Sequence, residues 1–149
     1  MVKRKFLLPL LLLAGFACTE KIEMRIPSQR VYLELDLTYN DKALNALYSH
    51  KIYTKDNIDQ ANEYTGFGGV LVFHGDNDIF YAFDAACPYE AQSNVIVTVE
   101  DGDINAICPK CGSKYELLYG VGNPVSGPSE YYLQRYPVSR SGNKIFVGY

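Results

Sequence analysis

One stretch of the chain decides its fold: residues 87–113, which read CPYEAQSNVIVTVEDGDINAICPKCGS. This stretch holds every cysteine of the sequence except Cys18, with one thiol at its start and two near its end. Two runs rich in β-branched residues, 95–99 and 104–107, flank a turn-like segment that contains Asp-Gly. Such a pattern predicts a β-hairpin, which folds the second cysteine segment back toward the first. We therefore expect three thiols to gather on two facing loops, an arrangement suited to a metal or a disulfide bridge.

The two cysteine segments resemble the Rieske iron–sulfur domain. That family carries Cys-x-His on one loop and Cys-x-x-His-Gly-Ser on a second loop, followed by an aromatic strand and a Gly-Pro loop. Here residues 87–89 (CPY) stand at the first motif and residues 108–113 (CPKCGS) at the second. Tyr89 and Cys111 replace the two ligand histidines of the family. The resemblance covers residues 69–149, and its downstream matches are Tyr115-Glu116-Leu117, Gly120, Gly127-Pro128, Leu133, Tyr136, Val138 and Ile145-Phe146-Val147.

The resemblance implies an all-β fold, a Rieske-like antiparallel two-sheet sandwich with a small two-hairpin cluster-binding subdomain. Period-two alternation and turn residues along the rest of the chain agree with this fold. Asn40-Asp41 is expected to cap a short helical turn, and residues 120–128 are expected to form a Gly/Pro loop. Residues 49–66 give no clear pattern. The expected strands cover residues 31–37, 69–73, 79–83, 114–119, 131–138 and 144–149.

The resemblance also implies a cofactor, a 2Fe–2S cluster in which two cysteines bind one iron and two histidines bind the other. It assigns Cys87 and Cys108 to the first iron, and Cys111 to the second iron as a thiolate in place of imidazole. Tyr89 joins the candidate ligands only if its phenol, with a reference pKa of about 10, is ionised. A tyrosine at this position also packs readily over its own loop. The implied function is ferredoxin-type electron transfer to a redox partner protein, through an altered or degenerate 2Fe–2S site.

Two alternatives remain open at this point. A disulfide from Cys87 to Cys108 or Cys111 would hold the loops without a cluster and stabilise the fold by about 3 kcal/mol. The chain would then be a cluster-free binding or scaffold protein. A structural zinc ion takes four protein ligands, of which the cysteine loops supply three. Glu90 departs from the usual ligand spacing, and His74 is expected to be exposed at the far end of its hairpin from Cys87.

The N-terminus has the features of a secretory signal peptide, which we place at residues 1–17. Three basic residues, 3–5, precede the apolar run 6–14, which is too short to span a bilayer as a helix. Residues 15–17 (GFA) put small side chains at the −3 and −1 positions before Cys18, which resembles a bacterial lipoprotein leader. In such leaders the cysteine thiol is acylated. The alternative is ordinary cleavage before Cys18, leaving its thiol free or paired.

The mature chain is expected to be a tether, residues 18–30, followed by one domain, residues 31–149. We expect an exported protein, anchored to a membrane through Cys18 on the periplasmic or cell-surface side. Without the three basic residues of the leader, 11 basic residues remain against 17 acidic ones, a formal charge of −6. An acidic surface disfavours nucleic acid. Independent catalysis is not predicted, and Asp84 and Glu90 are expected to be turn and surface residues.

Overall fold

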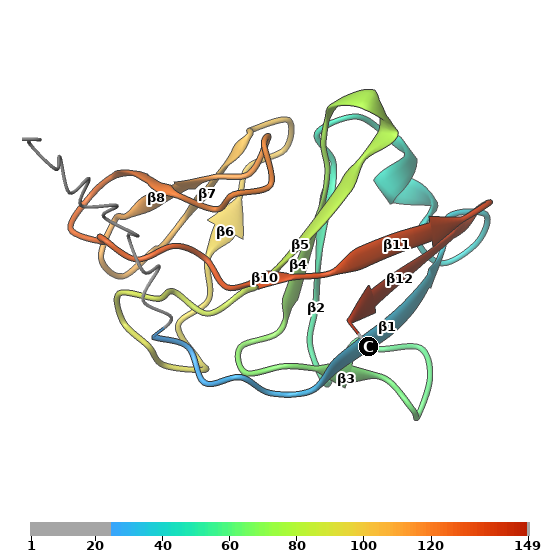
Figure 1. The fold of residues 1–149 in the computed structure, drawn as a ribbon, viewed down its shortest axis with the longest axis horizontal. Helices are drawn as coiled ribbons and strands as arrows, with labels where there is room; N and C mark the ends of the chain where they lie inside the picture. Colours follow the sequence, from blue (N-terminus) through green and yellow to red (C-terminus); the bar gives the residue numbers. More distant parts are fainter. Residues whose placement is uncertain (1–24, 149) are drawn as a thin grey trace, which may run out of the picture.

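The computed structural model describes residues 25–148, which form three antiparallel β-sheets and two short 3₁₀ turns (Figure 1). The 3₁₀ turns are η1 (Lys42–Asn45) and η2 (Asp76–Asp78). The strands in chain order are β1 (Val31–Asp36), β2 (His50–Tyr53), β3 (Tyr64–Thr65), β4 (Val70–His74), β5 (Phe80–Asp84), β6 (Thr98–Val99), β7 (Asn105–Ile107), β8 (Lys114–Glu116), β9 (Pro124–Ser126), β10 (Arg135–Tyr136), β11 (Val138–Ser141) and β12 (Lys144–Gly148).

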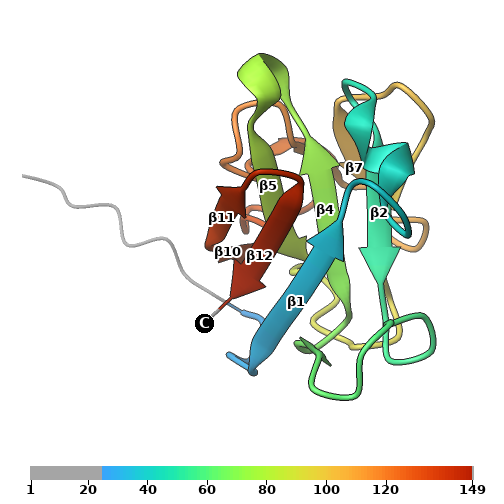
Figure 2. The same cartoon turned by 90° about the vertical axis from the view of Figure 1, so that its right-hand side faces the viewer.

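The sheets are stacked as three layers. The first sheet has the strand order β11-β12-β1-β3, the second β10-β5-β4-β2 and the third β6-β7-β8-β9. Figure 1 shows the β4–β5 layer between the β1–β12 layer and the β6–β8 layer, and Figure 2 shows β1 and β12 in front of β4 and β5. The first two sheets form the expected sandwich. The third is the expected small subdomain of two hairpins, so the predicted fold class is confirmed.

The middle layer serves two hydrophobic cores because side chains alternate between the two faces of a strand. Val70 and Val72 of β4 face the first core, which also contains Leu33 of β1. Leu71 and Phe73 of the same strand face a second core, which is shared with the third sheet. The five residues of β4 are all buried, as expected for a strand covered on both sides.

The β4–β5 hairpin delivers the chain to the first cysteine. Its register pairs His74 with Phe80 at the turn and Val70 with Asp84 at the opposite end. Two residues beyond that end, Ala86 forms an isolated antiparallel bridge with Ile96. The predicted hairpin is confirmed, and its geometry places the chain after β5 against the third sheet.

Some local expectations were wrong. His74 is buried, since it stacks on Phe80 with ring centroids 4.2 Å apart and its Nδ1 lies 2.8 Å from the carbonyl oxygen of Leu44. Asp41 does not cap η1 with its side chain. Its carboxylate accepts hydrogen bonds from Tyr53 Oη at 2.6 Å and Lys51 Nζ at 2.8 Å instead. The expected Gly/Pro loop contains β9, and the segment without a clear pattern contains β2 and β3.

The predicted signal peptide and Cys18 lie outside the described residues. The last residues of the predicted tether do lie within them: Ile26 is buried, and Arg25 Nη1 donates a hydrogen bond of 2.8 Å to the carbonyl oxygen of Tyr89. Across residues 25–148, the chain forms no helix with the length and apolar character that crossing a bilayer requires.

Candidate metal centre

Two tight turns present the cysteines. In the first, the Cys87 amide donates to the carbonyl oxygen of Val95 at 2.9 Å, and the Ala91 amide donates to the carbonyl oxygen of Cys87 at 2.8 Å. In the second, the Gly112 amide donates to the carbonyl oxygen of Cys108 at 2.9 Å. Gly112 has φ +75°, a left-handed conformation that glycine adopts without steric cost. The turns therefore hold their thiols through backbone bonds that do not depend on any ligand.

The three thiols lie together, as the hairpin pattern predicts. The Sγ atoms of Cys87 and Cys111 are 3.7 Å apart, and the sulfur atoms of Cys87, Cys108 and Cys111 all lie within 4.8 Å of one another. Cys87 and Cys108 are buried and Cys111 is half-buried. All three thiols are free in the described part of the chain. This is the one group of metal-ligating side chains that residues 25–148 bring together.

Two hydroxyl groups contact the sulfur atoms. The hydroxyl oxygen of Tyr115 lies 3.3 Å from Cys87 Sγ, and the hydroxyl oxygen of Ser113 lies 3.2 Å from Cys111 Sγ. Ser113 Oγ also accepts a 3.1 Å hydrogen bond from the Ser129 amide. Close packing fixes this contact, since a Cβ on Gly127 would lie 2.5 Å from Ser113 Cα. Both hydroxyls occupy positions of the sequence motif, but their roles at the sulfur atoms were not predicted.

The thiols of Cys108 and Cys111 differ in pKa. Burial raises the pKa of Cys108 to about 11, against the opposing effect of amide hydrogen bonds from Cys111 and Lys110. Burial also acts to raise the pKa of Cys111, but hydrogen bonds from the Ser113 hydroxyl and amide lower it below its usual range. Cys111 therefore ionises more readily than Cys108, and its side chain is more accessible to solvent.

Tyr89 and Glu90 follow the first cysteine in the same turn. Tyr89 is 39 % exposed, and its position as a ligand stays a prediction. Glu90 is not a simple surface residue, because its carboxylate forms a 2.7 Å ion pair with Lys110 Nζ. That pair joins the two cysteine turns and leaves Glu90 engaged by a cation.

The donor set can be compared with the needs of a Rieske-type cluster, in which each iron takes two protein ligands. Cys87 and Cys108 fit one iron, since both thiols are buried and close together. For a second iron, the described residues offer the Cys111 thiolate, and no fourth histidine, cysteine or carboxylate joins the three thiols. The site therefore does not fit a binuclear cluster with four ligands of these kinds. It fits a metal centre held by three thiolates.

A buried carboxylate supports the first cysteine turn. Asp84, expected to be a turn residue at the surface, is fully buried at the end of β5. Its two oxygens accept hydrogen bonds from the amides of Phe67 at 3.0 Å, Gly68 at 3.0 Å and Ala86 at 2.8 Å, and from Tyr136 Oη at 2.7 Å. This carboxylate ties the loop before β4 to the backbone just before Cys87. Its long-range partners explain why the sequence did not indicate its burial.

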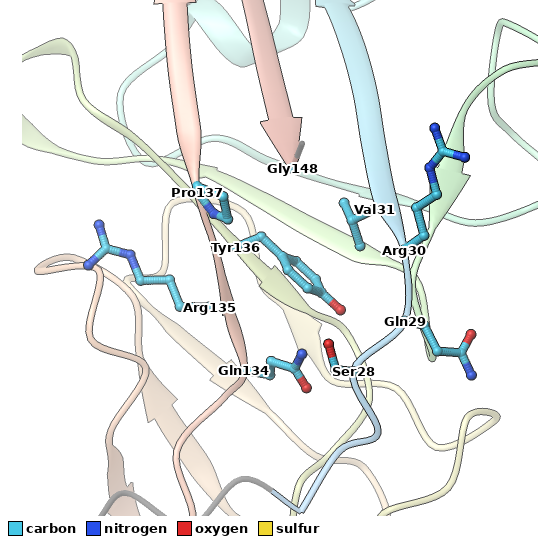
Figure 3. Close-up of a pocket in the computed structure, with 9 residues that line it drawn as sticks. All are labelled: Ser28, Gln29, Arg30, Val31, Gln134, Arg135, Tyr136, Pro137 and Gly148. Atoms are coloured by element: carbon cyan, nitrogen blue, oxygen red, sulfur yellow. The ribbon is translucent and has the colours of Figure 1, made fainter.

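A separate cavity of about 550 Å³ lies between the start of β1 and the β10–β11 connection (Figure 3). Its lining includes Gln134, which is buried and whose Oε1 has no hydrogen-bond partner among the described residues. Figure 3 shows the side chains of Arg30 and Arg135 pointing away from this cavity. Arg30 lies over the Tyr64 ring, and Arg135 lies over the Tyr81 ring. None of the lining residues belongs to the cysteine turns.

Comparison with solved structures identifies the fold. A chain from the complex of reduced oxygenase and oxidized ferredoxin in carbazole 1,9a-dioxygenase superposes with a TM-score of 0.51 and 16% sequence identity, over 80% of this chain and 94% of that chain. This chain has the fold of Rieske-type ferredoxins. The ferredoxin of carbazole 1,9a-dioxygenase from Nocardioides aromaticivorans IC177 matches with a TM-score of 0.48 and 18% identity, over 81% of this chain and 96% of that chain. No protein-family model and no curated protein matches the sequence.

Proposed function

We propose that this protein is an exported electron-transfer protein with the Rieske-type ferredoxin fold and an altered iron centre on Cys87, Cys108 and Cys111. The observation that carries the proposal is the convergence of three thiols, with all sulfur atoms within 4.8 Å of one another, on the two segments that resemble the Rieske ligand motifs. Thiolates favour iron and zinc over hard cations such as magnesium. Iron on thiolates exchanges single electrons, so it suits a carrier between two proteins.

The surroundings of the thiols support a redox role. Hydroxyl groups at 3.2 and 3.3 Å from two of the sulfur atoms can stabilise thiolate charge. The half-buried Cys111 brings one edge of the centre to the surface, which shortens the path to a partner. The solved structure that this chain matches contains an oxygenase together with its oxidized ferredoxin, which supports a partner protein that accepts or donates electrons here.

The proposal includes a lipid anchor. The leader-like residues 1–17 and the cysteine that follows them support acylation of Cys18 and placement on the periplasmic or cell-surface side. Mass spectrometry of membrane-extracted protein should then show a lipid-modified N-terminus at Cys18. Cys18→Ala should release the protein from membranes, whereas a wild-type protein found unmodified in the soluble fraction would contradict the anchor.

The electron-transfer proposal is tested on the full chain, purified without oxygen in detergent. Iron should co-purify, and its visible absorption should bleach with dithionite and return with a one-electron oxidant such as ferricyanide. Cys87→Ser and Cys108→Ser should abolish the absorption, while Glu90→Gln, which breaks only the ion pair with Lys110, should keep it. A reduced, fully thiol-containing protein that takes up no redox-active metal would overturn the proposal.

A second candidate is a metal-free binding or scaffold lipoprotein with a disulfide. The 3.7 Å separation of the Cys87 and Cys111 sulfur atoms favours this pair for a bridge. Cys108 would then stay reduced. Peptide mapping of protein alkylated at the moment of cell lysis distinguishes the two candidates, because a native Cys87–Cys111 disulfide leaves too few thiolates for the iron centre.

A further inference from the structure

We infer that Cys87, Cys108 and Cys111 hold a single metal ion together, with a non-protein ligand in the fourth position, in place of a binuclear iron–sulfur cluster. The inference rests on the proposed metal-binding function of this site and fixes its number of metal ions. Three observations carry it: the distances between the sulfur atoms, the Cys-x-x-Cys spacing of the second turn, and the ion pair that holds the nearby Glu90 carboxylate.

The distances match ligands of one ion. A thiolate lies about 2.3 Å from a tetrahedral zinc or similar ion, which places two such sulfur atoms about 3.8 Å apart. The Cys87 and Cys111 sulfur atoms are 3.7 Å apart. The remaining separations between sulfur atoms are within 4.8 Å. They therefore exceed the spacing of two thiolates on one ion by at most about 1 Å.

A binuclear cluster requires a different arrangement. Cys111 stands at a position that serves the second iron in the Rieske motif, whereas Cys87 stands at a position that serves the first. Ligands on different irons are separated by the full width of the cluster, two iron–ligand bonds and the distance between the irons. They must therefore lie farther apart than two ligands on one iron. Cys87 and Cys111 instead have the spacing of ligands that share an ion.

The second turn has the local form of a single-ion site. It reads CPKCG at residues 108–112, a Cys-x-x-Cys spacing that structural zinc sites use to place two thiolates on the same metal. The Gly112 amide donates a 2.9 Å hydrogen bond to the carbonyl oxygen of Cys108, and the chain reverses at Gly112 with φ +75°. Both sulfur atoms of this turn lie within 4.8 Å of each other and of Cys87 Sγ.

No fourth histidine, cysteine or carboxylate among the described residues joins the three thiols. The Glu90 carboxylate is held by Lys110 at 2.7 Å, and Tyr89 is 39 % exposed. Cys111 is half-buried, so solvent reaches this edge of the site. Metal sites with three protein ligands typically hold water or an exchangeable ligand in the fourth position. The ions that fit three thiolates and one open position are zinc, ferrous iron and, as a probe, cobalt.

The test counts metal ions and sulfide on the full chain, purified anaerobically in detergent with all thiols reduced. Metal analysis should give about one zinc or iron per chain and no acid-labile sulfide. Titration of the metal-free protein with Co²⁺ should saturate at about one equivalent, with thiolate-to-cobalt charge-transfer absorption and tetrahedral visible bands. Because the three thiolates share the ion, Cys87→Ser, Cys108→Ser and Cys111→Ser should each weaken cobalt binding by at least about tenfold.

Glu90→Gln is the matched control, since it changes a neighbouring side chain and should leave the stoichiometry and the cobalt spectrum unchanged. Tyr89→Phe tests the fourth position: an unchanged cobalt spectrum supports a non-protein ligand there, and a changed one would overturn that part of the inference. About two irons with two sulfides per chain would overturn the inference while electron transfer stands. One zinc without redox activity would support the inference and overturn electron transfer. One iron without sulfide, reversibly reduced, would support both. Fully reduced protein that binds neither cobalt nor iron would overturn both.

Discussion

The two hydrophobic cores, one on each face of the β4–β5 hairpin, differ in what completes them. The first core is filled by aliphatic side chains such as Leu33 and Ile145, together with two tyrosines and Phe80. The second core has Cys87 and Cys108 within its buried residues and Cys111 at its edge. The first core is stabilised by the burial of its side chains. The stability of the second core also depends on whether its thiols are free, bound to a metal or joined in a disulfide.

The largest effect is expected at the junction of the two cores, from Asp84→Ala. This substitution removes the acceptor of four hydrogen bonds, leaving the amides of Phe67, Gly68 and Ala86 and the Tyr136 hydroxyl without their partner. Unsatisfied buried donors cost about 1–3 kcal/mol each, and we expect a total loss of about 4–6 kcal/mol in the free energy of unfolding. Urea denaturation followed by circular dichroism measures it.

Tyr136→Phe is the matched control for that experiment, because it removes a single donor from the same carboxylate. It should cost about 1 kcal/mol. If Asp84→Ala destabilises the protein no more than Tyr136→Phe does, the carboxylate does not hold the loop before β4 to the backbone before Cys87.

The next largest effect is expected from metal removal, which should destabilise the second core more than the first. A ligand that binds only the folded state stabilises it by about 4 kcal/mol at a thousandfold excess over its dissociation constant. Hydrogen exchange should show this gain at the amides of β7 and β8, which carry the thiol-containing core, and much less at β1 and β12. Equal protection changes in both sheets would show that the two cores unfold as one unit. The Cys108→Ser variant is the control, since added metal should leave its exchange unchanged.

The sequence predicted the features that depend on neighbouring residues and missed those that depend on distant ones. Alternation and Asp-Gly turns depend on neighbouring residues, so the hairpins and the meeting of the three thiols were predictable. The burial of Asp84 and His74 was not, because each is created by partners far along the chain. The strand β9 was not recognised because it begins at Pro124 and is followed by Gly127. The choice of metal is also beyond the sequence pattern, since iron and zinc share thiolate ligands.

Alkaline pH should weaken both cores. Burial is the main reason that the pKa values of Tyr53, Tyr115 and Tyr136 are raised above the ordinary value of 10.0. A raised pKa in the folded state means that the stabilising effect of the protonated phenol is fully present below pH 10 and is lost as the pH rises above it. At one pH unit above 10, ionisation of each of these tyrosines in the unfolded state should lower the free energy of unfolding by about 1.4 kcal/mol.

Single substitutions assign that loss to one core or the other. Tyr53→Phe removes a titrating phenol from the first core and Tyr115→Phe removes one from the second, so each should reduce the slope of stability against pH above 10 by a similar amount. Denaturation of metal-free protein from pH 8 to 11 measures the slope. If neither variant changes it, alkaline unfolding has another cause. Tyr39→Phe is the control, because Tyr39 is exposed.

The smallest expected effect is confined to one thiol of the second core. Ser113→Ala removes the hydroxyl that lies 3.2 Å from Cys111 Sγ and helps to lower its pKa. The pKa of Cys111 should therefore rise, and since the thiolate is the nucleophile, alkylation of Cys111 by iodoacetamide at pH 8 should slow severalfold in the reduced, metal-free protein. Mass spectrometry of Cys111-containing peptides gives the rate, and Ser141→Ala on the exposed β11 is the control.

Ser113→Ala also leaves the Ser129 amide without its acceptor, at a cost of about 1 kcal/mol, so unfolding is measured in parallel. Faster alkylation together with lower stability would mean that the turn has opened, and an unchanged rate in a stable variant would show that the Ser113 hydroxyl does not control the thiol.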